Sequence, residues 1–370
     1  MGALKHVGVV VWCVGIAACI ALAVWSGLDD IGQAVASVGW WGVAGVVLVR
    51  AATVAIAGNG WWLLLPGNVV SQRRAVDPGL ARDQHFDDGA HREQTTSALP
   101  LRIAVLLRFV REAVNSLLPL TQVGGDIISA RLLTFWAVPG PLGAASIIVD
   151  VLMQAATQFV FAALGIITLI AIGTDTSVAA AATTSLAVAA PLLGGFYVAQ
   201  RHWGHRVLHA VLGRLSGDSG WRVLGTVDAV YDSLAAIYAG RSGLIASSVV
   251  HMTGWLVGIA EVLIVLRCMG LPATAGEALV IESLVQAVRG AAFAVPSALG
   301  AQEAGLILLC GLFQIPADQA LALSFIKRAA DLAIGVPGLA VLQVLEGRRL
   351  TATWVRRAGQ PQMSLDLKSE

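Results

Sequence analysis

The sequence predicts an all-α polytopic membrane protein with about six full spans and two oppositely oriented re-entrant broken helices in an inverted repeat. Three observations carry this prediction. The chain of 370 residues is 57% hydrophobic and 13% charged, with a mean hydropathy of +0.77, whereas soluble domains have about 45–50% apolar and about 25% charged residues. Six apolar stretches are long enough to cross a bilayer, which takes about 20 residues. Two further apolar regions are interrupted by proline, glycine and charge.

The six complete spans are predicted at residues 7–25, 42–65, 142–172, 178–200, 243–266 and 317–345, and the interrupted regions at 103–138 and 275–315. We divide the chain into two N-terminal spans (1–65), a polar cytoplasmic loop (66–99), a first repeat (100–200), an amphipathic cytoplasmic linker (201–242), a second repeat (243–345) and a cytoplasmic tail (346–370). The first span is alternatively read as a cleaved signal peptide, because Lys5 precedes an apolar run that ends in small residues.

The orientation follows from the basic residues of the connecting loops, which stay preferentially in the cytoplasm. Loops 26–41 and 173–177 contain no Lys or Arg, whereas loops 66–102 and 201–242 and the C-terminal tail are rich in arginine. We therefore expect a multi-pass protein of the bacterial inner (cytoplasmic) membrane with both termini in the cytoplasm. This orientation makes region 103–138 enter and return from the cytoplasmic side, and region 275–315 from the external side.

The two interrupted regions also match each other at an offset of 177 residues. Each contains a proline, Pro119 or Pro296, that is followed seven residues later by an acid, Asp126 or Glu303. Two further charged positions coincide at the same offset, Glu112 with Arg289 and Asp150 with Lys327. Inverted repeats with broken helices are typical of transporters. Because lipid cannot satisfy free backbone groups, we expect the two breaks to meet inside the protein.

Charged residues within the predicted spans are the candidates for function. Each costs roughly 2.5–3.5 kcal/mol at the centre of a span, so these side chains must face the inside of the bundle. We predict a central polar groove for a head group, whose candidate phosphate or hydroxyl partners are Arg108, Arg111, Arg131, Arg289, Lys327 and Arg328, with Glu112 and Asn115 beside them. The alternative is a set of structural ion pairs that lock helices together, such as Asp150 with Lys327, Glu112 with Arg289, or Arg328 with Asp331.

The glycines near the breaks, Gly124, Gly125 and Gly300, would let backbone N–H groups approach the head group. Asp126 and Glu303 are candidate gate or coupling carboxylates, and Asp150 and Asp331 are coupling or structural charges. Arg50 and Glu261 lie in other spans and are open to either interpretation. His251 is either a packed histidine or a proton carrier.

No cofactor or metal site is expected. The four cysteines, at positions 13, 19, 268 and 310, have no spacing typical of a zinc site or a disulfide framework. The net charge of +1 gives no basis for a nucleic-acid partner. Because motifs of ATP hydrolysis and of common hydrolases do not occur, we expect a protein that is not an enzyme.

The stretches REAVNSLLPLTQVGGDIISARLL and VPSALGAQEAGLILL, together with Asp150 and the Lys327–Arg328 pair, resemble the membrane region of the lysylphosphatidylglycerol synthase family. The resemblance covers about residues 100–345 and is greatest to the stand-alone, hopanoid-associated members. It implies lipid translocation between leaflets. The residues that match the family pattern are Glu112, Asn115, Pro119, Gly124, Gly125, Asp126, Arg131, Pro296, Gly300, Glu303 and Arg328. Because no soluble aminoacyltransferase domain follows residue 345, lysyl transfer is not expected.

The leading hypothesis is thus a lipid transporter or flippase whose partner is a membrane lipid, a hopanoid or a phospholipid. A lipid-modifying transferase of the membrane and a scaffold that assembles lipid-biosynthesis enzymes are the alternatives. The sequence leaves the lipid, the direction of transport, the energy source and the oligomeric state open.

Overall fold

The structure is a computed structural model that describes residues 28–65, 99–118, 124–173, 227–292 and 295–358, together with six single positions between 177 and 191. Within this part of the chain the regular structure is helical throughout. Four helices are long and apolar enough to cross a membrane, namely α2 (Leu28–Trp62), α6 (Gly140–Ile172), α10 (Arg241–Cys268) and α13 (Ala317–Ala358). They confirm the prediction of a polytopic all-α membrane protein.

These four helices coincide with the spans predicted at 42–65, 142–172, 243–266 and 317–345. The predicted span at 7–25 lies outside the described residues, and so does the span at 178–200 apart from a few single positions. The loop predicted at 26–41 is wrong from residue 28 onward, because α2 already begins there. Gly39, with φ 65° and ψ 171°, bends the chain within α2, and a glycine adopts such a positive φ without a steric penalty.

Each interrupted region folds as two helices joined at a break. In the first region, α4 (Leu101–Leu117) is followed by α5 (Gly124–Leu133) and the short 3₁₀ helix η2 (Thr134–Trp136). In the second region, α11 (Ala275–Ala291) and α12 (Ala301–Gly311) flank the 3₁₀ helix η5 (Pro296–Ala298). The breaks therefore fall where the sequence predicts them, although Pro119 itself lies outside the described residues.

The second break has a clear local cause. Ser297, Ala298 and Gly300 have positive φ angles of 54°, 49° and 81°, which a helix does not contain. Helix α12 then begins where the Glu303 carboxylate accepts a hydrogen bond of 2.8 Å from the Gly300 backbone N–H. This carboxylate satisfies one of the backbone donors that a helix N-terminus leaves free.

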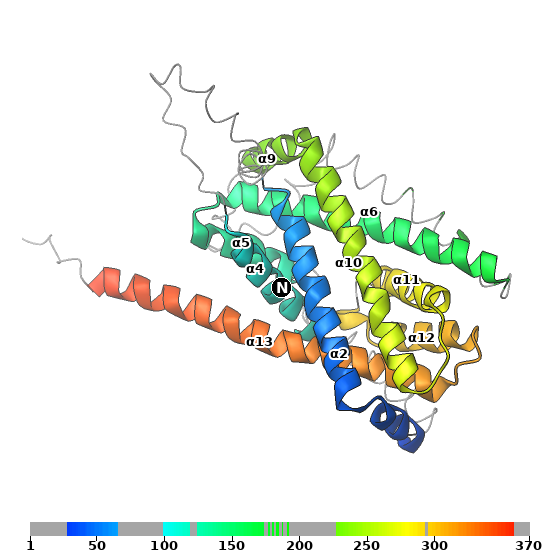
Figure 1. The fold of residues 1–370 in the computed structure, drawn as a ribbon. Coiled ribbons are helices and arrows are strands. Elements are labelled where there is room, and N and C mark those ends of the chain that lie inside the picture. The colour runs from blue at the N-terminus through cyan, green and yellow to red at the C-terminus, as the bar shows by residue number, and fades with distance from the viewer. Residues whose placement is uncertain are drawn as a thin grey trace, which may run out of the picture.

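The helices form two inverted halves, a first half of α2, α4, α5 and α6 and a second half of α10, α11, α12 and α13. The main contacts among these eight helices correspond in the two halves: α2 packs against α4 and α13 as α10 packs against α11 and α6, and α4 packs against α13 as α11 packs against α6. In Figure 1, α6 and α13 run in opposite directions, and so do α2 and α10. The broken helix of each half is thus seated on the long helix of the other half.

Small residues allow these close crossings. A Cβ atom at Gly338 of α13 would lie 2.7 Å from the Ala113 side chain of α4, and one at Gly165 of α6 would overlap the Ser283 hydroxyl of α11. Real Cβ atoms do not approach neighbouring atoms so closely, so larger residues here would push the helices apart. The pairs α4–α13 and α6–α11 are equivalent in the two halves, and a glycine lies in each of them.

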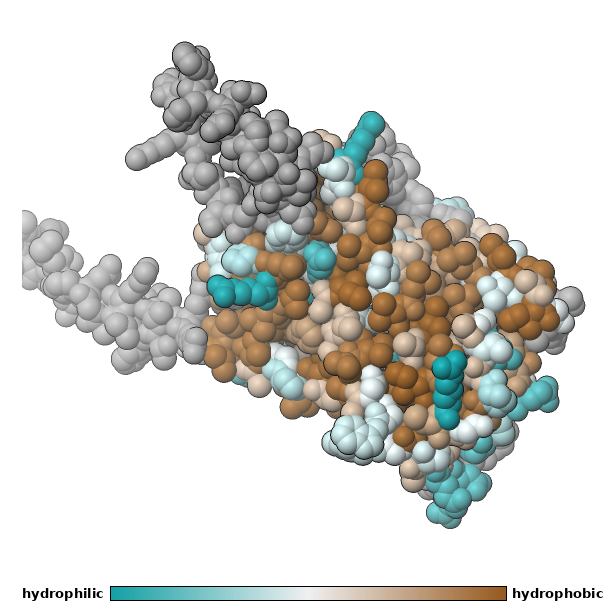
Figure 2. Space-filling model, viewed as in Figure 1, coloured by the Kyte–Doolittle hydropathy of each residue, from teal (hydrophilic) through white to brown (hydrophobic). Residues whose placement is uncertain are grey.

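Two hydrophobic cores surround the middle of the bundle. One lies among α4, α5, α9 (Val227–Ala239) and the first turns of α6, and the other among α10, α11, α12 and the end of α6. The outer surface is also largely apolar, as the brown area over α2 and α10 in Figure 2 shows. Large exposed side chains such as Leu48 and Ile245, with 72% and 66% of their surface accessible, are suited to contact with lipid.

Candidate functional site

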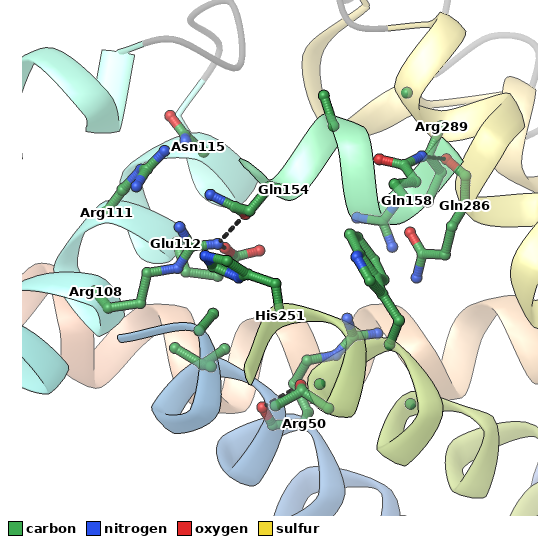
Figure 3. Close-up of a pocket in the computed structure, with 18 of the residues that line it drawn as sticks. Arg50, Arg108, Arg111, Glu112, Asn115, Gln154, Gln158, His251, Gln286 and Arg289 are labelled. Atoms are coloured by element: carbon green, nitrogen blue, oxygen red, sulfur yellow. Dashed lines mark hydrogen bonds and ion pairs between the residues drawn. The ribbon is translucent and has the colours of Figure 1, made fainter. Parts of the chain in front are cut away.

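A cavity of about 330 Å³ lies between the two cores, where α2, α4, α5, α6, α10 and α11 surround it. Figure 3 shows charged, amide and imidazole side chains from α2, α4, α6, α10 and α11 around it. Its polar lining consists of Arg50, Arg108, Arg111, Glu112, Asn115, Asp126, Gln154, Gln158, His251, Glu261, Glu282, Gln286 and Arg289. Such a density of charge inside an apolar bundle is costly unless the charges are paired, so their pairing defines the site.

The first charge cluster belongs to the first half and centres on Asp150, which is fully buried. Arg111 binds both Asp150 and Asp126. Arg108 lies 3.4 Å from Asp150 and donates a hydrogen bond of 2.8 Å to Gln154. These arginines come from α4, which brings two guanidinium groups one turn apart onto the first turns of α5 and the middle of α6.

A histidine of the second half completes this cluster. His251 of α10 is buried, and its Nε2 lies 3.0 Å from Asp150 Oδ1. Gln154 donates a further hydrogen bond of 2.7 Å to the other carboxylate oxygen of Asp150. The Asp150 carboxylate is therefore shared by α4, α6 and α10.

The second charge cluster belongs mainly to the second half and centres on Lys327, whose side chain is fully buried in α13. Its Nζ atom lies 2.7 Å from Glu261 and 2.8 Å from Glu282. Arg50 reaches across from α2 and lies 2.9 Å from Glu261 and 3.4 Å from Asp331. Glu112 lies 3.7 Å from Arg108 and is counted in the first charge cluster. Each of the two clusters then contains three carboxylates and two positively charged Lys or Arg side chains.

A third polar group fixes the second break rather than the cavity. Glu303 accepts hydrogen bonds of 2.7 Å from both Ser324 and Arg328 on α13, in addition to the bond from Gly300. The Ser297 hydroxyl donates to the Ser116 backbone carbonyl at the end of α4. The second break therefore contacts the end of α4 that leads into the first break, so the two interrupted regions meet inside the protein as expected.

Arg289 differs from the other cations around the cavity. One nitrogen of its guanidinium group, Nη1, is buried without a hydrogen-bond partner in the part of the chain that the structure describes. The other arginines of the lining, Arg50, Arg108 and Arg111, all contact carboxylates. Arg289 therefore offers a donor to a molecule that enters the cavity.

The structure separates the residues that the sequence proposes for head-group binding. Six of them line the cavity: Arg108, Arg111, Glu112, Asn115, Asp126 and Arg289. Asp150, Lys327 and Asp331 lie behind the lining and pair with it. Gly124 and Gly125 begin α5, and the Gly125 N–H donates to Asn115 at 2.7 Å. Gly300, Glu303 and Arg328 belong to the second break, and Arg131, with 47% of its side chain exposed, lies away from the cavity and pairs with Glu346.

The ion pairs proposed from the sequence differ from those observed. Asp150 pairs with arginines of α4 and Lys327 with two glutamates, so these two charges are held in separate clusters. Arg328 binds Glu303 and Asp331 binds Arg50, each on another helix. The partners are set by how the helices cross, which spacing along one helix does not reveal.

Several lining residues were not among the proposed binding residues, notably Glu282, Gln286 and Trp255, as well as Arg50, Glu261 and His251. Their common signal is a polar or amphipathic group inside an apolar helix, which marks a bundle interior. Among the described residues, no group of three or more His, Cys, Asp or Glu side chains is placed to hold a metal ion.

Comparison with known families gives one result that covers most of the chain. The family model described as the lysylphosphatidylglycerol synthase TM region matches residues 9–338. No curated protein and no solved structure matches the sequence.

Proposed function

This chain belongs to the lysylphosphatidylglycerol synthase TM region family, and from that premise we propose that it is a lipid transporter of the flippase type. The lipid is a hopanoid or a related membrane lipid, the protein resides in the bacterial inner membrane with both termini in the cytoplasm, and it moves the lipid without modifying it. A membrane lipid-related function is common ground for the family. The transport step is our inference.

The observation that carries the proposal is the charge-lined cavity inside an apolar bundle. A lipid crosses between leaflets slowly because its polar head must leave water, and an unpaired polar group in an apolar medium costs several kcal/mol. A cavity of about 330 Å³ with guanidinium, carboxylate and amide groups replaces water around such a head. The apolar tail remains in the lipid that surrounds the bundle.

The inverted halves supply a way to expose the cavity to one side and then to the other. In transporters built from inverted repeats, the substrate site lies near the midplane between the halves, and rocking of one half against the other alternates access. Here the cavity is lined by both halves, with Arg108 and Gln154 from the first and His251 and Arg289 from the second. Arg289 is the residue best placed to bind the head, because within the described residues it combines an unused buried Nη1 donor with the absence of an ion pair. Arg50 and Arg108 also have an unused Nε, but carboxylates hold both of them.

The test is lipid exchange between leaflets in proteoliposomes that contain the full chain. A lipid with a labelled head is placed in both leaflets, the outer label is quenched, and the rate at which the inner label becomes accessible is measured. We expect the protein to accelerate this rate and Arg289→Gln to reduce the acceleration at least roughly tenfold, the equivalent of about 1.4 kcal/mol. Arg267→Gln is the matched control, because Arg267 is an exposed arginine of α10 outside the cavity.

Three results would contradict the proposal. The first is a rate equal to that of empty vesicles for both hopanoid and phospholipid probes. The second is a rate that Arg289→Gln leaves unchanged. The third is the appearance of a chemically modified lipid in the same vesicles, which mass spectrometry detects and which would favour a transferase.

A further inference from the structure

Two of the polar contacts that join the halves across the cavity differ in one respect. Arg50 of the first half reaches Glu261 of the second, and His251 of the second half reaches Asp150 of the first. Arginine stays protonated at all physiological pH values. Imidazole, by contrast, gains and loses a proton between about pH 5 and 8. Of these two contacts, the Arg50–Glu261 pair is therefore permanent, and the His251–Asp150 contact depends on a proton.

We propose that His251 is a proton-binding residue whose protonation tightens the contact between the two halves. On the basis of the proposed function, uptake and release of this proton during the transport cycle couple lipid movement to the proton gradient. His251 acts as a positioning residue in this scheme, because it holds α10 against α6 through Asp150 and does not need to contact the lipid.

The geometry determines where the proton binds. A carboxylate accepts hydrogen bonds, so the neutral imidazole keeps its hydrogen on Nε2, which faces Asp150 Oδ1 at 3.0 Å. The additional proton binds at Nδ1 and converts a neutral hydrogen bond into a charge-assisted one, which is roughly twice as strong. Because Asp150 is fully buried, the low local dielectric constant increases this difference.

Charged side chains of the neighbouring helices surround His251. The charged groups of the surrounding helices that line the cavity or pair with its lining are Asp150 on α6, Arg108, Arg111 and Glu112 on α4, Asp126 on α5, Arg50 on α2, Glu282 and Arg289 on α11, Glu261 on α10, and Lys327 and Asp331 on α13. The nearest of them form the first charge cluster, with three carboxylates and two guanidinium groups. A proton on His251 brings this cluster to neutrality. The second cluster has the same balance of charges but contains no imidazole among its described members.

The contact between α6 and α10 continues one turn beyond His251. The Trp255 indole N–H donates to the Thr157 hydroxyl at 3.1 Å, and its ring stacks on Phe161 with centroids 6.1 Å apart. Both partners of Trp255 lie on α6, as Asp150 does. A change in the His251–Asp150 contact therefore alters the distance between α6 and α10, and this distance can be measured.

The experiment uses two spin labels in the full chain, one at Val160 of α6 and one at Val249 of α10, which are 49% and 61% exposed. The four native cysteines are replaced by alanine, and the protein is studied in lipid nanodiscs without added substrate. We expect the ratio of short to long distances to fall by roughly tenfold between about pH 6 and about pH 8, because two pH units change the ratio of charged to neutral imidazole by up to about 100-fold. His251→Gln should give the long distance, and His251→Lys the short distance, at both pH values.

Trp255→Phe is the matched control, since it removes a hydrogen bond between the same two helices without removing a titratable group. It should change the distance at both pH values and keep the pH dependence. A wild-type distance that does not change with pH overturns the inference, even if a variant fails to fold. A pH-dependent change that persists in His251→Gln also overturns it.

This measurement does not depend on lipid transport. If the distance responds to pH through His251 but proteoliposomes show no lipid exchange, the proposed function fails while the proton-binding role of His251 remains. If lipid exchange occurs and the distance is independent of pH, only the present inference fails.

Discussion

Removal of the buried ammonium group of Lys327 is the most direct test of how the charges in this bundle are held. Lys327→Met keeps the length and the apolar stem of the side chain but deletes the charge. Three carboxylates, Glu261, Glu282 and Asp331, would then share the single guanidinium group of Arg50. Among the described residues, Glu282 would retain the Gln286 amide, which donates a hydrogen bond of 2.7 Å.

The magnitude follows from the burial of these groups. Lys327 has no exposed surface, and Glu261 and Glu282 are 1% and 2% exposed. Breaking a buried ion pair by removing one partner costs about 3–5 kcal/mol, because the other charge is left uncompensated. A loss of 1 kcal/mol in the free energy of unfolding lowers the melting temperature of a domain of about 150–250 residues by roughly 2–4 °C, and that of a longer chain by less. We therefore expect the melting temperature of Lys327→Met to fall by roughly 5–10 °C.

The assay is thermal unfolding of the detergent-purified protein, followed by the fraction that elutes as a single species after heating. The double variant Glu282→Gln/Lys327→Met removes the uncompensated carboxylate, so it should recover at least half of the lost stability. Arg131→Gln is the control, since the Arg131–Glu346 pair at 3.0 Å is largely at the surface and such pairs contribute about 0–1 kcal/mol. A Lys327→Met protein as stable as the wild type, or a double variant less stable than the single one, would contradict this account of the second charge cluster.

Two further predictions concern single contacts. Gly165→Ala places a Cβ atom against the Ser283 hydroxyl and should lower the melting temperature by several degrees, through an overpacking cost of about 1–3 kcal/mol. The additional substitution Ser283→Ala in the same chain should restore part of the lost stability. A Gly165→Ala protein with an unchanged melting temperature would show that α6 and α11 separate freely. Asp126→Asn should stop lipid exchange in proteoliposomes with little loss of thermal stability, because Asp150 still binds Arg111, the arginine that Asp126 releases. Glu303→Gln, by contrast, should mainly lower the thermal stability, because Glu303 anchors the second break to α13 and does not line the cavity. Equal effects of the two substitutions on exchange at equal stability would contradict this distinction.

Much of the fold could be predicted from the sequence because its signals are local. A run of about 20 apolar residues identifies a span wherever it lies, and the four described helices begin and end within a few residues of the predicted positions, except at the start of α2 and at the end of α13, which continues to Ala358. There, Asp29 and Asp30 resembled loop residues but occupy the first turn of a helix, where carboxylates are stabilised by the helix dipole. The helix breaks could be predicted for the same local reason, since proline and glycine interrupt a helix in any context.

The candidate site could be predicted only in part. The sequence identified Arg108, Arg111, Glu112, Asp126 and Arg289 as intramembrane polar residues, and all five line the cavity. It grouped them with Arg131 and Arg328, whose side chains the structure places at the surface and at the second break. Charge and position in the chain do not distinguish these cases, because all of them are polar residues in or beside apolar helices.

The amino-acid sequence was enough to identify a membrane protein, to locate the helix breaks and to show that the two interrupted regions repeat at one offset. These are properties of composition and of spacing along the chain, whereas the family follows from the match of residues 9–338 to a family model. Which charges meet became known from the tertiary structure. Arg50 and Glu261 are 211 residues apart and His251 and Asp150 are 101 apart, so their contact depends on how α2, α10 and α6 cross. The crossings are set by the packing of small residues and by the burial of every charge at once, and no local pattern encodes that balance.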